Sequence, residues 1–200
     1  MDRQGEEQFV NFARNACNGK SDCYIGRGGE RKQATIVFMD IRGFTSMSET
    51  MQPDEVVEML NEYMTRMVAI ITDNGGVIDK YVGDAIMAVW GVPISKGQDA
   101  ANAIRACLAM RQELAILNKL RVGRGQNALS IGMGLNHGDV TAGNIGSSER
   151  MEYTVIGDAV NLAARIESAT KEMGTDLLVT QSVQESLGDR FIFENYSTVS

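Results

Sequence analysis

The stretch VIDKYVGDAIMAVW (residues 77–90) consists of two β-rich apolar runs that meet at Gly83-Asp84. Gly-Asp pairs favour tight turns, so residues 77–82 and 85–90 are predicted to form a β-hairpin. The turn leaves Asp84 at the tip of the hairpin, between two apolar strands. This hairpin is the element around which the rest of the chain can be placed.

A helix and a strand are predicted on the N-terminal side of the hairpin. Apolar residues recur at three- and four-residue steps over 56–71, which is typical of an amphipathic helix, and Asn74-Gly75-Gly76 ends it. Upstream, the apolar run Thr35–Met39 reads as a buried strand that ends at Asp40. A loop is expected over 41–45.

Helices and strands also alternate on the C-terminal side. A helix is predicted from about Gln98 to Lys119, followed by a polar loop and two strands, 129–136 and 140–144, around a turn at 137–139. The remaining predicted elements are a strand 153–156, a helix 158–172, a strand 177–179, a helix from Thr180 and a last strand 190–194. This order, βαββαβ plus a C-terminal βαβ extension, predicts an α+β fold with a palm-like, ferredoxin-like sheet and helices packed on it.

Composition limits the class of protein. A chain of 200 residues with 44% hydrophobic residues can form one compact domain, assigned here to residues 34–200 after a polar lead-in, 1–33. No run approaches the length of a membrane span, and the N-terminus lacks a signal peptide. The net charge of −7 argues against a nucleic-acid partner, and it means that a polyphosphate substrate needs local positive charge, most simply from metal ions.

Cysteine and histidine usage narrows the chemistry further. The three cysteines, Cys17, Cys23 and Cys107, fit no zinc spacing and are interpreted as reduced thiols of a cytoplasmic protein. His137 is the only histidine, which excludes a site with several histidine ligands. A metal site in this chain is therefore expected to use carboxylates, which suit hard ions such as magnesium or manganese.

Two aspartates are candidates for such a site. Asp40 follows the first strand and Asp84 lies at the hairpin tip, and a βαβ unit followed by a hairpin brings these two points together. Capping and turn formation are the ordinary explanations for each aspartate alone. Together they predict a pair of carboxylates that holds two ions against a triphosphate. The backbone N–H groups of 41–45 are expected to face phosphate oxygens at a helix start.

A second candidate group lies on the helix predicted for 158–172. Asn161 and Arg165 are four residues apart, so they project from one helix face, and small alanines between them allow close packing. A solvated polar face is the alternative reading. The functional reading is a pair that orients a sugar and neutralises a phosphate in the transition state.

Four motifs resemble the signatures of class III adenylyl and guanylyl cyclases, and they occur in the family's order over about residues 33–200. FMDIRGFT (38–45) is similar to the first signature, DKYVGDA (79–85) to the second and GDAVNLAAR (157–165) to the third, while Asn144-Ile145-Gly146 also matches. The resemblance is nearest to the bicarbonate-responsive bacterial and soluble branch, of cyanobacterial type. It implies conversion of ATP to cyclic AMP and pyrophosphate.

The resemblance also implies residue roles. Asp40 and Asp84, with Ile41 beside them, correspond to the metal site, which takes two divalent ions, Mg²⁺ or Mn²⁺, with Ca²⁺ as an alternative at one position. Asn161 and Arg165 correspond to the catalytic pair of the transition state. In the family these two groups come from different subunits, so a homodimer with two interface sites is expected.

The base-reading residues implied by the family are Lys80 and Thr154, and Gly43, Phe44 and Thr45 complete the substrate-binding set. Lysine only donates hydrogen bonds and suits adenine N1, and threonine can accept from the 6-amino group. Guanine presents the opposite pattern, so a lysine at this position argues against a guanylyl cyclase. That enzyme nevertheless stays open as an alternative.

Other readings and partners also remain open. A diguanylate cyclase shares the palm-like core, but its Gly-Gly-Asp/Glu-Glu-Phe signature is missing here. A degenerate, nucleotide-binding regulatory domain is a further alternative, although all six functional positions are present. The family's additional phosphate-binding lysine near the last hairpin cannot be placed. Regulatory domains in a longer parent protein are expected, and bicarbonate is a candidate regulator.

Overall fold

The computed structural model describes residues 29–147 and 149–195. Predicted features in the first 28 residues, including Cys17 and Cys23, lie outside this part of the chain. The elements, in chain order, are β1 (Glu30–Ile41), α2 (Phe44–Ser48), α3 (Pro53–Asp73), β2 (Val77–Val82), β3 (Ala85–Trp90), α4 (Asp99–Gly123), β4 (Ile131–Gly146), β5 (Met151–Ile156), α5 (Asp158–Glu172), β6 (Leu177–Val179), α6 (Gln181–Leu187) and the 3-10 helix η1 (Gly188–Arg190).

One mixed sheet organises the fold. Its strand order is β2-β3-β1-β4-β5, and β6 pairs in parallel with β4 while all other pairs are antiparallel. The first four strands therefore have the ferredoxin-like order that the βαββαβ pattern predicted. The predicted α+β class is confirmed.

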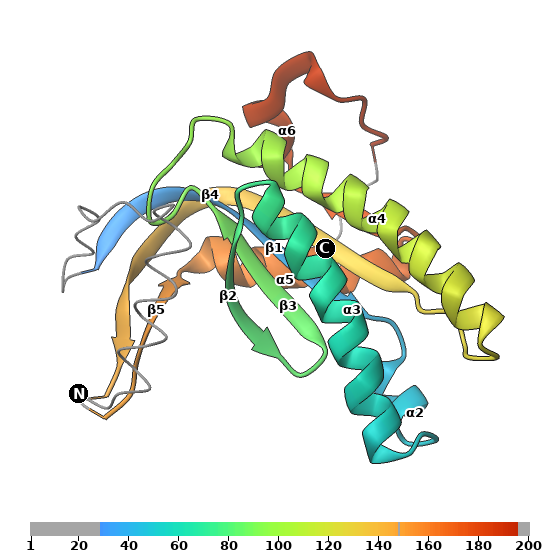
Figure 1. The fold of residues 1–200 in the computed structure, drawn as a ribbon. Coiled ribbons are helices and arrows are strands. Elements are labelled where there is room, and N and C mark those ends of the chain that lie inside the picture. Colours follow the sequence, from blue (N-terminus) through green and yellow to red (C-terminus); the bar gives the residue numbers. More distant parts are fainter. Residues whose placement is uncertain (1–28, 148, 196–200) are drawn as a thin grey trace.

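Helices cover both faces of the sheet (Figure 1). Helices α3 and α4 pack on one face, where Met67 and Met110 join Val37 and Met39 of β1 in the larger core cluster. Helix α5 packs on the other face, where Ala163 contacts the cluster that contains Ile36. Alternate residues of β1 thus belong to different cores, as the two-residue period of a strand requires.

Local sequence explains the boundaries of the longest N-terminal helix. Helix α3 begins with Pro53 at its first position, and the backbone N–H of Gln52 donates to the Glu55 carboxylate at 2.9 Å. This is one of the two hydrogen bonds of a capping box, and proline at this position loses no helical hydrogen bond. The helix ends at Asp73, directly before the predicted Asn-Gly-Gly stop. The predicted hairpin 77–82/85–90 is also confirmed with its turn at Gly83-Asp84.

The turn predicted at 137–139 was wrong, because β4 is one continuous strand of 16 residues. His137, Gly138 and Asp139 pair with Thr35, Ala34 and Gln33 of β1, which starts at Glu30 and not at the predicted Thr35. The longer β1 provides hydrogen-bond partners for the polar residues of β4, so the strand continues through them.

Other differences concern element ends. Residues 44–48 form the short helix α2 inside the predicted loop, and α4 continues to Gly123. Residues 191–194, predicted as part of a last strand, follow η1 without forming a strand. Cys107 is a buried free thiol in α4. None of the helices in the described part of the chain combines the length and hydrophobicity of a transmembrane span.

Candidate functional site

Asp40 and Asp84 converge, as the sequence predicted. Asp40 is the second-last residue of β1, and Asp84 lies in the turn between β2 and β3, with β3 paired to β1. The backbone N–H of Ile41 donates to the Asp40 carboxylate at 2.9 Å and to the Asp84 carboxylate at 3.2 Å. Two carboxylates from separate elements therefore share one donor at the end of the central strand.

The pair is electrostatically unfavourable without cations. Burial, followed by the hydrogen bond and charge of Asp84, raises the pKa of Asp40 to about 7. The charge of Glu167 on α5 adds to this rise, and the N–H of Ile41 opposes it only in part. A carboxyl group in such a setting gains from a nearby positive charge, because the charge replaces the missing compensation.

Two residues near the pair were not predicted from the sequence. Glu167 is half-buried, and burial raises the pKa of its carboxyl while the Ser168 hydroxyl and the charge of Arg42 lower it. Tyr63 of α3 is fully buried, and burial and the charges of Asp40 and Asp84 raise the pKa of its phenol. The helical periodicity identified Tyr63 as a core residue, but periodicity does not reveal that its hydroxyl lies near carboxylates.

The loop after Asp40 differs in part from the prediction. The N–H of Ile41 is occupied by the two carboxylates, and the N–H of Arg42 donates to the carbonyl of Ser130 at 2.8 Å. These two groups therefore do not face a phosphate, which corrects the prediction for 41–42. Gly43 has φ 69°, a left-handed conformation that favours glycine, and α2 starts directly after it. The N–H groups of Phe44 and Thr45 lie in the first turn of α2, where intrahelical acceptors are missing.

Lys80 and Thr154, the residues predicted to recognise the base, both contact a third residue, Asp79. Thr154 of β5 donates its hydroxyl to the Asp79 carboxylate at 2.7 Å, and the Lys80 ammonium lies 3.4 Å from the same oxygen. Thr154 is buried and the side chain of Lys80 is 37% exposed. The structure thus brings Lys80 and Thr154 to one place. The sequence pointed to Lys80 but not to its neighbour Asp79.

Asn161 and Arg165, the predicted catalytic pair, both belong to α5. Both are exposed residues of α5, whereas Ala163 between them is buried against the sheet. They share a helix face, as predicted, and that face points away from the core of its own chain. Among the residues that the structure describes, the guanidinium of Arg165 has no hydrogen-bond or ion-pair partner.

The donor set at Asp40 and Asp84 fits hard divalent cations. Both groups offer carboxylate oxygens, and the described residues contain no cluster of three or more His, Cys, Asp or Glu side chains that could enclose an ion. Magnesium and manganese are commonly held by one or two carboxylates while phosphate oxygens and water complete the coordination. Asp40 and Asp84 would hold such ions only in company with a phosphate-bearing ligand.

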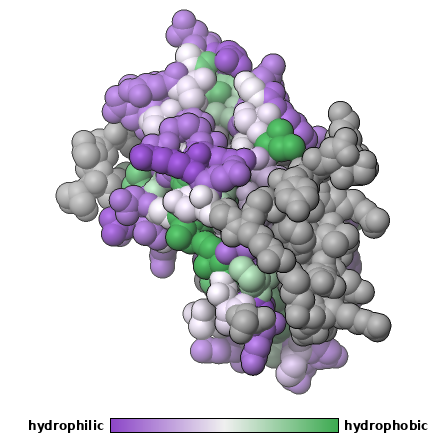
Figure 2. All heavy atoms as spheres, turned by 90° about the vertical axis from the view of Figure 1, so that its left-hand side faces the viewer, coloured by the Kyte–Doolittle hydropathy of each residue, from purple (hydrophilic) through white to green (hydrophobic). Residues whose placement is uncertain are grey.

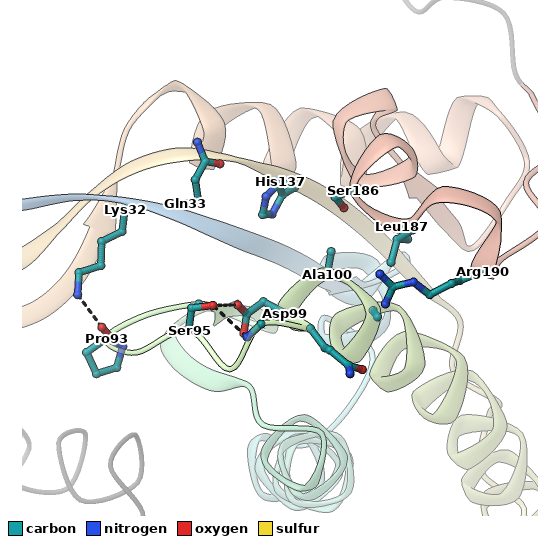
Figure 3. Close-up of a pocket in the computed structure, with 14 residues that line it drawn as sticks. Lys32, Gln33, Pro93, Ser95, Asp99, Ala100, His137, Ser186, Leu187 and Arg190 are labelled. Carbon is teal, nitrogen blue, oxygen red and sulfur yellow. Dashed lines mark hydrogen bonds between the residues drawn. The ribbon is translucent and has the colours of Figure 1, made fainter.

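A separate pocket of about 440 Å³ lies near the N-terminus of α4 (Figure 3). Lys32 donates to the carbonyl of Pro93 at 2.6 Å, and Ser95 donates to the Asp99 carboxylate. His137 faces this pocket and its ring shares a 2.9 Å hydrogen bond with Thr35. These polar groups are satisfied within the chain, and the pocket contains none of the predicted site residues.

The chain matches the family of the adenylate and guanylate cyclase catalytic domain over residues 29–200. The chain is 41% identical over 179 residues to an adenylate cyclase of Anabaena cylindrica, covering 86% of this chain and 34% of that protein. It is 39% identical to the terminal-differentiation specific adenylate cyclase of Dictyostelium discoideum, covering 92% of this chain and 9% of that protein. The chain thus spans about a third of the first relative and about a tenth of the second.

Solved structures with the same fold include cyclases of both base preferences. The guanylyl cyclase Cya2 superposes with a TM-score of 0.81 at 40% identity, covering 86% of this chain and 87% of that one. The adenylyl cyclase CyaB from P. aeruginosa superposes with a TM-score of 0.75 at 37% identity, covering 80% and 82%. Overall similarity therefore does not distinguish a preference for ATP from one for GTP, and the preference has to be argued from individual residues.

Proposed function

The chain belongs to the adenylate and guanylate cyclase catalytic domain family, and on this premise we propose that it converts ATP to 3′,5′-cyclic AMP and pyrophosphate. The observation that carries the proposal is the convergence of Asp40 and Asp84 on the N–H of Ile41 at the end of the central strand. This carboxylate pair is the predicted place for the metal-bound triphosphate. The adenylate cyclases of Anabaena and Dictyostelium support the same reaction.

The reaction needs alignment and charge neutralisation. The ribose 3′-hydroxyl gives its proton to water and its oxygen forms a bond to the α-phosphorus, while the bond from that phosphorus to the pyrophosphate oxygen breaks in line. Asp40 and Asp84 would hold two divalent ions, which would supply positive charge beside the triphosphate and acidify the 3′-hydroxyl. Asn161 orients the ribose, so that the attacking oxygen is already aligned. Arg165 donates to the oxygens on which negative charge grows.

Base preference is assigned to Lys80 and Thr154. The Lys80 ammonium donates to adenine N1, and the Thr154 hydroxyl oxygen accepts from the 6-amino group. Guanine carries a donor at N1 and an acceptor at O6, so both contacts are mismatched. A guanylyl cyclase is the second candidate, because Cya2 is 40% identical to this chain.

The proposal includes a homodimer in which each site uses two chains. Asn161 and Arg165 are exposed side chains of α5. Exposed apolar residues occur on β2, on the β4–β5 hairpin and on α5; they are Tyr81, Val82, Ile145, Met151, Ile156 and Leu162. Figure 2 shows hydrophobic atoms along the middle of one face, bordered by hydrophilic ones. A second copy of the chain that covered such residues would bring its α5 to the carboxylate pair.

A cyclase assay tests the proposal. Purified protein with Mn²⁺ is incubated with ATP or GTP, and cyclic nucleotide and pyrophosphate are quantified. We expect cyclic AMP, with kcat/KM for ATP at least about 10-fold above that for GTP, and no product from Asp84→Asn. Preferred formation of cyclic GMP would identify a guanylyl cyclase. Binding of nucleotide without product would identify a regulatory domain.

Regulation belongs to the same proposal. Because the chain covers 34% or less of the Anabaena and Dictyostelium enzymes, we propose that it is the catalytic part of a longer, cytoplasmic signalling protein with regulatory domains. Bicarbonate is the candidate small-molecule activator. Parallel assays at equal pH and ionic strength, with sodium bicarbonate or sodium chloride, test this part. Equal rates in both salts would remove bicarbonate from the proposal.

A further inference from the structure

Asp79 stands at an irregularity of the sheet. In the β2–β3 ladder Ile78 pairs with Ala88 and Lys80 pairs with Met87, so Asp79 is an extra residue without a partner on β3. Extra residues of this kind form β-bulges, which redirect side chains and often lie beside functional sites. The bulge brings the Asp79 carboxylate to 3.4 Å from the ammonium of the next residue, Lys80, although neighbouring strand residues normally point to opposite faces.

The Asp79 carboxylate also connects the strands at the two ends of the sheet. Strands β2 and β5 are the two ends of the path β2-β3-β1-β4-β5, yet Asp79 of β2 is bonded to β5. The Thr154 hydroxyl donates to it at 2.7 Å and the Val155 N–H at 3.2 Å. The sheet is therefore curved enough to close on this residue, and Asp79 ties both predicted base readers together.

The surroundings of Asp79 are those of an ionised carboxylate. Its side chain is 1% exposed and its three polar neighbours, Thr154, Val155 and Lys80, are all donors. Burial raises the pKa of Asp79, and the Thr154 hydrogen bond, the Lys80 charge and the Val155 N–H oppose that rise. The three donors offset part of the cost of burying the charge and hold the carboxylate in one place in the pocket wall.

The hydrogen bond from Thr154 to Asp79 decides whether the Thr154 hydroxyl can donate to a further partner or only accept from it. A hydroxyl group has one hydrogen to donate and two lone pairs to accept. Because that hydrogen is given to Asp79, the oxygen of Thr154 can only accept from a further partner. An adenine 6-amino group is a donor and matches it, whereas the guanine O6 is an acceptor and does not.

We propose that Asp79 is the positioning residue that sets the adenine preference, since it makes Thr154 an obligatory acceptor and holds the Lys80 ammonium beside it. The proposal rests on the proposed function in one respect, namely that Lys80 and Thr154 face the base. Asp79 does not touch the base itself, because its side chain is buried behind these two residues.

The test compares base preference in Asp79→Asn and wild type at pH 8. An asparagine amide can donate to the Thr154 oxygen, which frees the hydroxyl hydrogen to point at the base and to bind guanine O6. We expect the ATP-to-GTP ratio of kcat/KM to fall by about 10- to 100-fold, with most of the loss on ATP. Equal losses for both nucleotides would show a purely structural role and overturn the proposal.

Control variants test whether Asp79 acts on base preference through the Thr154 hydroxyl. Thr154→Val should lower the ratio by itself, and adding Asp79→Asn to Thr154→Val should then change it by less than about threefold. Asp139→Asn removes an exposed strand carboxylate of β4 and should leave the ratio unchanged. If Asp79→Asn fails to fold, Asp79→Ala removes the acceptor without adding a donor and is expected to lower the ratio as well. An unchanged ratio in the folded variant contradicts the proposal.

A binding measurement separates this proposal from the cyclase proposal. ATP and GTP compete for a fluorescent mant-nucleotide with Ca²⁺ present, and the ratio of their dissociation constants is compared in wild type and Asp79→Asn. A wild type that prefers ATP, and a variant that loses the preference, support the role of Asp79 even if turnover is absent. A wild type that binds GTP at least as tightly as ATP overturns it even if cyclic AMP is formed.

Discussion

The Asp40 side chain is needed in its charged form at a position that disfavours the charge. It must be charged to hold cations, yet it lies beside Asp84 in a partly buried position where its pKa rises to about 7. Without cations, the folded protein therefore disfavours its ionised form. Functional carboxylates of this type reduce the stability of the metal-free protein, because the fold keeps a repulsive pair in place.

Asp40→Asn is predicted to stabilise the metal-free protein at pH 8 while abolishing activity. The unfolded carboxyl titrates near 3.8 and the folded one near 7, so its unfavourable contribution is absent below about pH 4, grows up to about pH 7 and persists above it. With EDTA at pH 8, we expect the variant to melt about 2–4 °C above wild type. The difference should shrink towards pH 5. Differential scanning fluorimetry over this range measures it.

Two further measurements make the prediction specific. Asp73→Asn removes an exposed carboxylate at the end of α3 and should keep the pH dependence of wild type. Mn²⁺ with a non-cyclisable ATP analogue should raise the melting temperature of wild type more than that of Asp40→Asn. A variant that melts below wild type at every pH would show that the Asp40–Asp84 repulsion is not a significant cost.

At the scale of single residues, the sequence predicted those whose role follows from their place in a motif. Asp40 and Asp84 follow a strand end and a turn, which are readable patterns. Asp79 was not found because its function depends on a bulge and on a contact with Thr154, 75 positions away. Glu167 was missed for the same reason: its effect on Asp40 arises from the packing of α5, and no local pattern reports it.

The close approach of α5 to β4 is the packing feature that places the candidate catalytic pair. A methyl group added at Gly134 of β4 would lie 2.1 Å from the backbone nitrogen of Glu167 and 2.7 Å from the carbonyl oxygen of Ala163. These are backbone atoms of α5, so the helix itself would have to move. The absent side chain thus sets the height of α5 above the sheet, and with it the position of Asn161 and Arg165.

Gly134→Ala is predicted to destabilise the protein and to reduce activity together. Overpacking of this kind costs about 1–3 kcal/mol, and a displaced α5 would misplace Arg165. Urea unfolding and the cyclase assay measure the two effects. Gly123→Ala is the matched control: it lies at the end of α4 with no atom near the added methyl, so stability should not fall. Full activity in Gly134→Ala would mean that the helix height is unimportant.

Element prediction succeeded where a period and a stop signal coincided, as in α3, the β2–β3 hairpin and α5. It was wrong for β4, whose polar residues 137–139 resemble a turn. Their strand conformation comes from pairing with residues 33–35 of β1, about 100 positions earlier. A local reading of the sequence contains no information on such a partner, so it divided one strand into two.

At the scale of the whole molecule, the predicted functional residues of one chain fall into two groups. Asp40 and Asp84 lie at the end of the central strand, while Asn161 and Arg165 are on the exposed face of α5. The sequence predicted that both sets are present and, through the family resemblance, that they come from two copies. The position of the pair on the outer face of its helix is the structural reason to expect this division.

Complementation between inactive variants tests the division of the site. Asp40→Asn and Asn161→Ala should each be inactive as homodimers, because both sites of each dimer lack one essential group. In a heterodimer, one site combines the intact carboxylates of the Asn161→Ala chain with the intact α5 of the Asp40→Asn chain, and the other site carries both changes. Co-expression with two different affinity tags and sequential purification isolates this heterodimer. It should show about half of the wild-type rate.

The heterodimer of Asp40→Asn and Asp84→Asn is the control and should stay inactive, because both changes affect the same half of the site. No recovery in the test pair would mean that each site is built within one chain, and recovery in the control would mean that Asp40 and Asp84 do not belong to the same half of a site.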